Sequence, residues 1–332
     1  MRSSKKELNM GIQASYIGLD KNVFLQKIEQ AKTVLNDCCL CEHICSVNRS
    51  IAELGFCQAG ENVEVAYWGI HKGEEPPFAD KGGAGAIFFS HCNFKCVYCQ
   101  NFQISRQKQI KDEFSPGQLA SIMLKLQKQG AQNIDLVSPT HFLPQIIEAI
   151  YLAKQQGLCL PILYNTNAYE SKTALELLDG IVDIYMPDLK YFDDSIALRY
   201  SGITNYVSTA KRTIKIMYNQ VGDFAQDSDG CAYRGLLIRH LVLPGNLSGS
   251  FEVLDFLKND IGSNIGLSLM SQYAPCYQAS EIDELNKRID SVFYNELVEY
   301  VEKIGFEQCW IQALKSSDAY MPDFQSKKVF VK

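Results

Sequence analysis

Six short apolar runs, separated by amphipathic helical stretches, constrain the fold of this 332-residue chain. From about residue 84 the two kinds of segment alternate, and that alternation is typical of βα units that build a parallel sheet. Six such units are fewer than the eight of a closed barrel, so we predict an α/β fold with a partial (β/α)6 barrel of parallel strands. The six predicted strands are Ala86–Ser90, Asn133–Ser138, Leu160–Asn165, Val182–Pro187, Leu236–Leu243 and Ile265–Met270.

Helix signals lie between these strands. Ser115 followed by Pro116 predicts a helix start, and Gly130 predicts its end. Beyond the last strand, the segment Ser280-Glu-Ile-Asp283 resembles a capping box and predicts a long helix that ends at Gly305.

Three regions follow from this pattern. Residues 1–80 lack the βα alternation and are predicted to form an N-terminal region with a small cysteine-rich metal-binding unit. Residues 81–311 form the predicted barrel, and residues 312–332 form a C-terminal tail. A chain of this length with 46% hydrophobic residues can bury one large core and a smaller one.

Charge and hydropathy limit the partners. The net charge is −6, and no Lys/Arg-rich stripe with interleaved aromatic residues is present, so nucleic acid is not expected as the main partner. The chain has no apolar run of 18 residues, and its charged start is not followed by an uninterrupted apolar stretch. We therefore expect no membrane partner and a cytoplasmic location.

Eight of the 12 cysteines lie in two short segments, residues 38–57 and 92–99. In a reducing compartment, such clustering favours metal binding over disulfides. The other four cysteines are isolated in sequence and are expected to be small apolar packing residues. They are Cys159, Cys231, Cys276 and Cys309.

The second cluster consists of three cysteines, Cys92, Cys96 and Cys99, directly after the first predicted strand. A four-iron cluster with only three thiolate ligands leaves one iron open for a substrate or cofactor. The loop that carries them follows a barrel strand, where active sites of barrel enzymes are built. We therefore expect a catalytic cluster here.

The first cluster offers four ligands, Cys38, Cys41, Cys45 and Cys57. Zinc and an auxiliary iron–sulfur cluster satisfy this ligand count equally well. Cys39 or His43 can replace one of the four. The alternative is a purely structural role for this block, whichever metal it holds.

The segment Cys-Asn-Phe-Lys-Cys-Val-Tyr-Cys-Gln-Asn, residues 92–101, resembles the signature of the radical S-adenosylmethionine (SAM) superfamily, and specifically its pyruvate formate-lyase activating enzyme-like branch. Met186-Pro-Asp-Leu-Lys190 and Ile238-Arg-His-Leu-Val-Leu-Pro-Gly245 resemble further elements of that branch. The resemblance covers about residues 35–310. A similar N-terminal cysteine block occurs in related uncharacterised proteins, which favours iron–sulfur over zinc at the first cluster.

The resemblance implies an oxidoreductase with a [4Fe–4S] cluster whose open iron binds SAM. An electron from a donor such as flavodoxin or ferredoxin would cleave SAM to a 5′-deoxyadenosyl radical, which abstracts hydrogen from a substrate. The activating enzymes imply a glycyl-radical protein as that substrate; the N-terminal block implies a small molecule or peptide, modified with a second iron–sulfur cluster. A non-catalytic iron–sulfur electron carrier or a zinc-stabilised binding protein is the alternative from a different class, and the missing fourth cysteine argues against the carrier.

The resemblance also implies cofactor contacts. Tyr98 would approach the adenine, Lys190 would pair with the SAM carboxylate, and Asp188 would contact its ammonium group or ribose. Asn167 would contact cofactor or substrate. Where relatives carry a glycine-rich turn after the second strand, this chain has Ser138-Pro-Thr140, whose hydroxyls would replace it.

Three histidines raise separate questions. His91 stands where relatives usually carry glycine. It could ligate metal, tune the cluster by hydrogen bonding or simply tolerate the local backbone, and if it distorts the loop, cluster assembly is the property affected. His141 is expected to be either packed or substrate-facing. Arg239 and His240 alternate in direction along a strand, so only one of them can face the barrel lumen.

Gln272 and Tyr273, after the sixth strand, are further substrate-side candidates.

Overall fold

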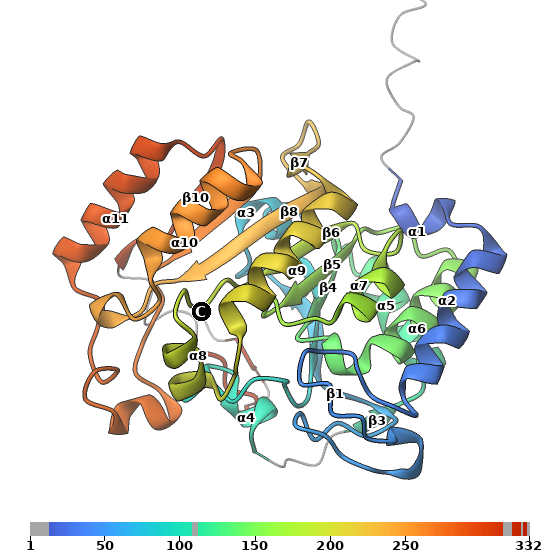
Figure 1. The fold of residues 1–332 in the computed structure, drawn as a ribbon. Coiled ribbons are helices and arrows are strands. Elements are labelled where there is room, and N and C mark those ends of the chain that lie inside the picture. The colour runs from blue at the N-terminus through green and yellow to red at the C-terminus, as the bar shows by residue number, and fades with distance from the viewer. Residues whose placement is uncertain (1–12, 108–111, 315–320, 327, 331–332) are drawn as a thin grey trace, which may run out of the picture.

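The computed structural model of the protein describes residues 13–107, 112–314, 321–326 and 328–330. A single twisted sheet forms its centre, in the strand order β10-β9-β8-β6-β5-β4-β2-β1-β3, with β7 paired to β8 (Figure 1). The strands are β1 (Val63–His71), β2 (Ala84–Phe89), β3 (Asp112–Phe114), β4 (Ile134–Val137), β5 (Ile162–Thr166), β6 (Ile184–Pro187), β7 (Ala225–Gln226), β8 (Ala232–Leu241), β9 (Gly266–Met270) and β10 (Gln308–Ile311).

The six predicted barrel strands are confirmed as β2, β4, β5, β6, β8 and β9. They pair in parallel, and β10 extends the parallel series beyond β9. The predicted α/β fold with a partial barrel is therefore confirmed. Strand β1 joins the other edge antiparallel to β2, so residues 63–71 of the N-terminal region belong to the same sheet as the barrel.

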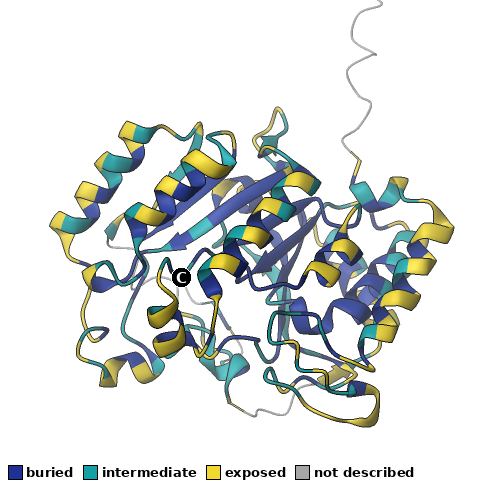
Figure 2. Cartoon of the chain, viewed as in Figure 1, coloured by how far each residue is buried: buried dark blue, intermediate teal, exposed yellow. Residues whose placement is uncertain are grey.

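Helices cover the outer side of the sheet, and the strands beneath them are buried (Figures 1 and 2). Short helices and turns connect the remaining elements. The helices are α1 (Ser15–Gly18), α2 (Lys21–Val34), α3 (Pro76–Ala79), α4 (Phe102–Ser105), α5 (Pro116–Lys128), α6 (Leu143–Gln155), α7 (Lys172–Leu178), α8 (Asp194–Ser201), α9 (Tyr206–Val221), α10 (Ser250–Phe256) and α11 (Ser291–Ile304).

Helix α5 shows how the local sequence sets an element. Ser115 accepts a hydrogen bond from the Gln118 backbone N–H, and the Gln118 side chain accepts one from the Ser115 backbone N–H, which completes a capping box. Pro116 occupies the first turn, where no backbone N–H is needed. The helix buries the predicted apolar face against the sheet: Leu119, Ala120, Ile122, Met123 and Leu126.

The helix predicted to start at Ser280 is wrong at its N-terminus. Residues Tyr277–Glu281 form a 3₁₀ turn, and α11 begins only after Asp290, whose side chain accepts from the Phe293 N–H. The Tyr273 hydroxyl donates to the Leu285 carbonyl between the two. That tertiary contact takes an acceptor that a continuous helix would have used.

The N-terminal segment packs onto the barrel. Helix α2 lies against α6, and the irregular chain after it pairs with the loop that follows β5. There the Glu42 N–H donates to the Tyr169 carbonyl and the Ser171 N–H to the Leu40 carbonyl. In the described part of the chain, no helix combines the length and apolar character needed to span a membrane.

Candidate functional site

A cavity of about 540 Å³ opens at the carboxyl ends of the parallel strands. Its walls come from the loop after β2 and from residues at or just beyond the ends of β4, β5, β6, β8 and β9. The predicted site residues that line it are Cys92, Cys96, Tyr98, Cys99, Ser138, Asn167, Asp188 and Lys190. Residues up to 98 positions apart in sequence, Cys92 and Lys190, thus share one chamber, as expected for the open end of a parallel barrel.

The cysteine loop is fixed by backbone hydrogen bonds to the end of α8. The Lys95 N–H donates to the Ser201 carbonyl and the Val97 N–H to the Tyr200 carbonyl, both over 2.9 Å. Each thiol also has a polar neighbour. The Phe94 N–H lies 3.4 Å from Cys92 Sγ, Ser201 Oγ lies 3.0 Å from Cys96 Sγ, and Ser105 Oγ lies 3.3 Å from Cys99 Sγ.

These hydrogen bonds to sulfur favour the thiolate form, which binds metal cations. Burial raises the pKa of the Cys96 thiol to about 12, against the opposing influence of Lys190 and the Ser201 hydroxyl. A metal must therefore displace the proton, and the hydrogen bonds to sulfur then stabilise the thiolate.

Asp188 and Lys190 form an ion pair in the cavity wall, with 2.5 Å between Asp188 Oδ2 and Lys190 Nζ. Burial alone would lower the pKa of Lys190, but the Asp188 carboxylate and the nearby cysteines raise it. The ammonium group is therefore charged at neutral pH. The Tyr206 hydroxyl accepts from the Lys190 N–H and donates to the Asp188 carbonyl, which fixes this strand end.

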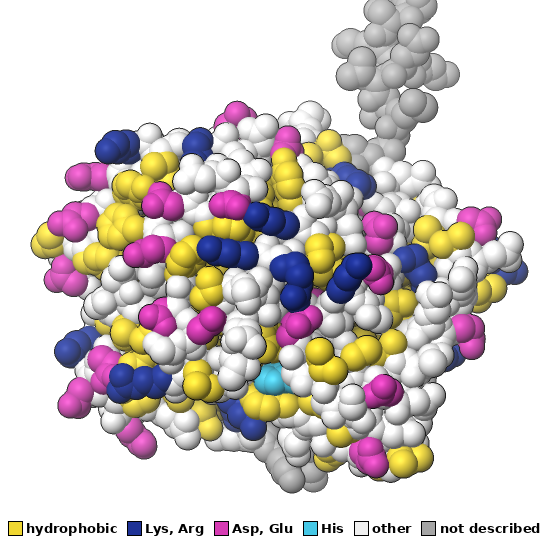
Figure 3. Space-filling model, in the orientation of Figure 1, with side chains coloured by type: hydrophobic (Ala, Val, Ile, Leu, Met, Phe, Trp, Pro, Cys, Tyr) yellow, Lys and Arg dark blue, Asp and Glu magenta, His cyan; other side chains and the backbone are white. Residues whose placement is uncertain are grey.

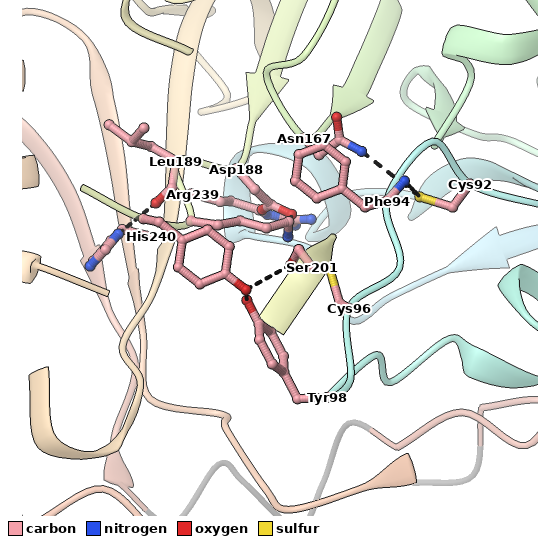
Figure 4. A network of polar contacts seen from close by, with 12 residues as sticks. Cys92, Phe94, Cys96, Tyr98, Asn167, Asp188, Leu189, Ser201, Arg239 and His240 are labelled. Carbon is pink, nitrogen blue, oxygen red and sulfur yellow. Dashed lines mark hydrogen bonds and ion pairs between the residues drawn. The ribbon is translucent and has the colours of Figure 1, made fainter. Parts of the chain in front are cut away.

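Tyr98 lies beside the cysteine loop with its hydroxyl 2.5 Å from that of Tyr191, which in turn lies 2.7 Å from Ser201 Oγ (Figure 4). Burial raises the pKa of Tyr98 well above its usual value, so the phenol is neutral. Its ring is 5% exposed and therefore forms a fixed part of the wall.

The alternation of β8 is resolved in favour of Arg239, which lines the cavity. Its Nε donates to Glu75 Oε1 over 2.8 Å, and Nη2 contacts both Glu74 and Glu75. His240 points away from the cavity; it is fully buried, with Nδ1 2.7 Å from the Leu189 carbonyl and Nε2 2.9 Å from Ser250 Oγ (Figure 4).

Glu74 and Glu75 were not predicted as site residues. They lie between β1 and α3, in the run Gly73-Glu-Glu-Pro-Pro77, within the region assigned to a separate unit. Only the antiparallel pairing of β1 with β2 brings this run to the cavity. Burial, followed by the charge of Glu74, raises the pKa of the neighbouring Asp135 well above its usual value, against the opposing influence of Arg239.

Comparison with known proteins agrees with this geometry. Residues 86–222 match the family model described as the radical SAM superfamily. Over 296 residues, the chain is 31% identical to "Uncharacterized protein MJ0674" of Methanocaldococcus jannaschii, covering 86% of this chain and 80% of that protein. The chain belongs to the radical SAM superfamily.

Three solved structures resemble parts of this radical SAM protein. SuiB of Streptococcus suis bound to S-adenosylmethionine gives a TM-score of 0.46 at 12% identity, over 67% of this chain and 48% of that one. HydG, a maturase of the [FeFe]-hydrogenase, gives 0.42 at 9% identity over 95% and 67%. Methylornithine synthase gives 0.40 at 11% identity over 95% and 82%. The chain spans about half the length of SuiB.

As a radical SAM enzyme, the protein uses a [4Fe–4S] cluster and SAM. The cavity fits both groups. Three thiols reach it from one loop, and Asn167, which also lines it, has a buried Oδ1 without a hydrogen-bond partner among the described residues. This oxygen can accept from a hydroxyl or ammonium group, and SAM carries both.

Of the two predicted hydroxyl residues, Ser138 lines the cavity and Thr140 does not. Ser138 lines the 540 Å³ cavity, with a positive φ of 55° at the strand end. Thr140 does not reach it, contrary to our prediction; its hydroxyl donates to Glu170 Oε1 over 2.8 Å. The 3₁₀ turn Thr140–Phe142 carries this side chain toward the N-terminal segment instead.

His91 and His141 have structural roles in the geometry. His91 adopts a φ of 69°, the left-handed region that favours glycine, and its Nε2 lies 2.9 Å from Glu64 Oε1. His141 is packed: its Nε2 donates to the Ser90 carbonyl over 2.7 Å, and burial lowers its pKa to about 3. After β9, Gln272 lines the 540 Å³ cavity, whereas Tyr273 does not.

The N-terminal cysteines gather at a second, much smaller cavity of about 10 Å³. Cys38, Cys41, Cys45 and Cys57 all line it, and Cys39 does not. As the side chains lie, no three His, Cys, Asp or Glu residues in the described parts of the chain are placed to hold a single metal ion, and this includes the cysteine triplet. Among the isolated cysteines, Cys309 of β10 lines the 540 Å³ cavity.

Proposed function

We propose that this radical SAM enzyme is an oxidoreductase that removes a hydrogen atom from a substrate held at the Glu74–Arg239 end of the SAM cavity. The observation that supports it is that one chamber contains the cysteine triplet and, in its wall, the group of Glu74, Glu75 and Arg239. When bound, the cluster and SAM together supply a 5′-deoxyadenosyl radical. The chain supplies binding, orientation and exclusion of water.

Individual residues have assigned tasks in this proposal. Cys92, Cys96 and Cys99 hold the cluster. Lys190 pairs with the SAM carboxylate, and Asp188 accepts from its ammonium group or ribose. Asn167 offers its unpartnered Oδ1 to the same ligand, and Tyr98 supplies a wall for the adenine. In the structure, Asp188 and Lys190 neutralise each other as an ion pair. In this proposal SAM enters between the two charged groups and pairs with both.

The walls favour a small polar substrate or a peptide. Two carboxylates, Glu74 and Glu75, face a single guanidinium, that of Arg239, so this group of three has an excess negative charge. A substrate with an amino group or other donors suits that excess. Glycyl-radical activation of a protein partner is the second candidate; the resemblance of residues 92–101 to activating enzymes favours it.

We propose flavodoxin or ferredoxin as the electron donor, which the family supports. Basic and acidic side chains are mixed on the face shown in Figure 3. Helix α9 carries Lys211, Arg212 and Lys215, of which Arg212 pairs with Glu42 and Lys215 with Asp260. Lys95, in the cysteine loop itself, is also exposed. We expect cluster reduction by flavodoxin to slow as salt concentration rises, because screening weakens attraction between exposed charges. A rate independent of salt would argue against a charged docking face.

Anaerobic reconstitution tests the function directly. With iron, sulfide, reductant and SAM, we expect the protein to release 5′-deoxyadenosine, and the Cys96→Ala variant to release none. Cys159→Ala is the matched control, because Cys159 is exposed and lies outside both cavities. Equal product from wild type and Cys96→Ala would contradict the assignment. Candidate small amines, peptides and glycyl-radical proteins can then be compared by deuterium transfer into 5′-deoxyadenosine.

A further inference from the structure

We propose that Cys38, Cys41, Cys45 and Cys57 form a closed four-thiolate metal centre, separate from the cysteine triplet, that binds zinc or an iron–sulfur cluster. The four thiol side chains come from a stretch of 20 residues and meet at one small cavity. Four protein ligands complete a structural site and leave no open position for a substrate, unlike the three of the triplet.

Backbone N–H groups aim at these sulfurs as they do at the triplet. The His43 N–H hydrogen-bonds to Cys41, and the Ala59 N–H to Cys57, in each case two residues further along the chain. The same spacing recurs in the triplet loop, where Phe94 donates to Cys92 and Asn101 to Cys99. Such bonds favour the thiolate, the form that binds metal.

The loop is shaped around Cys45 in particular. The Phe56 N–H lies 3.4 Å from Cys45 Sγ, and a Cβ on Gly55 would lie only 2.8 Å from that sulfur. Ile44 and Ser46, on either side, have positive φ values of 41° and 51°. Non-glycine residues hold this conformation only where surrounding contacts enforce it.

The rest of the cavity wall suits an anionic centre. Asn93 lines it, is 2% exposed, and has a buried Nδ2 without a hydrogen-bond partner among the described residues. Arg49 also lines it and is 1% exposed. A donor and a buried cation beside four thiols compensate the net negative charge of a metal–tetrathiolate centre.

The centre would adjoin the radical cluster loop. His43 Nε2 donates to the Asn93 carbonyl over 2.8 Å, and Asn93 is the neighbour of Cys92. The Asn93 side chain in turn accepts from Asn167 Nδ2 over 2.7 Å. His43, from the N-terminal segment, therefore helps to position Cys92 and Asn93 at the start of the triplet loop.

The thiols must move, or be spanned by a cluster, for metal to bind. Neither the four N-terminal thiols nor the triplet, as placed in the described residues, surrounds a position for a single metal ion. Zinc would draw four sulfurs to about 2.3 Å from one point, whereas a four-iron cluster would spread them around a larger core. The chemistry shared by both is four thiolates and a thiophilic metal.

The experiment isolates the second site by removing the first. A Cys92→Ala/Cys96→Ala/Cys99→Ala variant of the full chain is purified anaerobically, reconstituted separately with zinc or with iron and sulfide, and analysed for metal. We expect about one zinc, or up to about four irons with the spectra of a cluster, per chain. Metal analysis and Mössbauer spectra distinguish the two forms. The readout does not involve SAM cleavage, so a failure of the proposed radical function leaves it unaffected.

Two further variants in that background identify the ligands. Cys45→Ser with Cys57→Ser should abolish the bound metal, whereas Cys39→Ser should retain it, because Cys39 lies outside the cavity. The proposal is overturned if the triplet variant, with a circular dichroism spectrum like wild type, binds no stoichiometric metal. It is also overturned if Cys39→Ser loses as much metal as Cys45→Ser with Cys57→Ser.

Discussion

Lys190 is the residue whose surroundings best suit an anionic ligand group in the cavity, because its ammonium has one carboxylate partner and remains charged. We predict that Lys190→Met weakens SAM binding by about tenfold or more, which corresponds to about 1.4 kcal/mol. Cluster content should not change, since the cysteine loop is held by other contacts. Anaerobic calorimetric titration of reconstituted protein with SAM measures the effect. Lys154→Met, on α6, is the control; equal affinities in all three proteins would remove Lys190 from the site.

His240 makes a prediction about pH. Burial lowers its pKa from 6.5 to about 4, with Asp188 and Lys190 as the charged groups nearby. The native state therefore takes up this proton only near pH 4, whereas the unfolded chain binds it below about pH 6.5. Stability is full above pH 6.5 and is lost as the pH falls, by about 2 kcal/mol at pH 5.

The His240→Asn variant tests that sign. Asparagine can keep the donor to the Leu189 carbonyl but cannot titrate. Denaturant midpoints of wild type and variant at pH 7 and pH 5 should converge at the lower pH, because only wild type loses the His240 contribution. His141, whose pKa is also lowered, is present in both proteins and cancels in the comparison. A parallel decline of the two midpoints would show that His240 does not titrate in this way.

At the scale of elements, continuous apolar runs were sufficient to predict the barrel strands. Strands that are buried on both faces contain few polar residues and therefore read as apolar runs. Strand β1 was missed because its residues are mostly half-buried and its partner, β2, follows it antiparallel. The start of α11 was misplaced because two capping signals compete, and the contact between Tyr273 and Leu285 decides between them. Long-range pairing of this kind leaves no local signal.

The site divides in the same way. The triplet, Asp188 and Lys190 follow strand ends, so parallel topology alone places them together. Glu74 and Glu75 reach the cavity only through the antiparallel edge, and Thr140 leaves it through a single turn. These placements depend on contacts between distant segments, which motif spacing does not encode.

One close approach between elements gives a stability prediction. Strand β8 passes the chain before β7 so closely that a Cβ on Gly235 would lie 2.1 Å from the Asp223 carbonyl oxygen. We predict that Gly235→Ala destabilises the protein by about 3 kcal/mol or more, through this clash and its φ of 111°. Gly157→Ala, at a φ of 95° with nothing within 4 Å, should cost only about 1–2 kcal/mol. Similar denaturant midpoints for the two variants would contradict the clash.

At the scale of the whole molecule, segments from both ends of the chain contact the cysteine loop or the cavity. The N-terminal segment holds the cysteine loop through His43 and Asn93. The C-terminal segment returns to the cavity, where Pro322 and Phe330 form part of the wall. Part of the wall of the chamber in which radical chemistry is proposed is therefore formed by chain outside the βα units.

Phe330 is the main contact of that C-terminal segment. Its ring centroid lies 4.1 Å from that of His71, 5.4 Å from Phe88 and 5.6 Å from Tyr67. We predict that Phe330→Ala loosens the segment and admits water and solutes to the cavity. An iron chelator should then bleach the reconstituted triplet cluster several-fold faster than in wild type, because access limits its removal. The initial cluster content should be unchanged, because none of these ring contacts involves Cys92, Cys96 or Cys99.

Phe306→Ala is the matched control, because Phe306 is a half-buried phenylalanine outside the cavity wall. Its bleaching rate should equal that of wild type. If Phe330→Ala also bleaches at the wild-type rate, the C-terminal segment does not limit access. Solutes must then reach the cluster by another route.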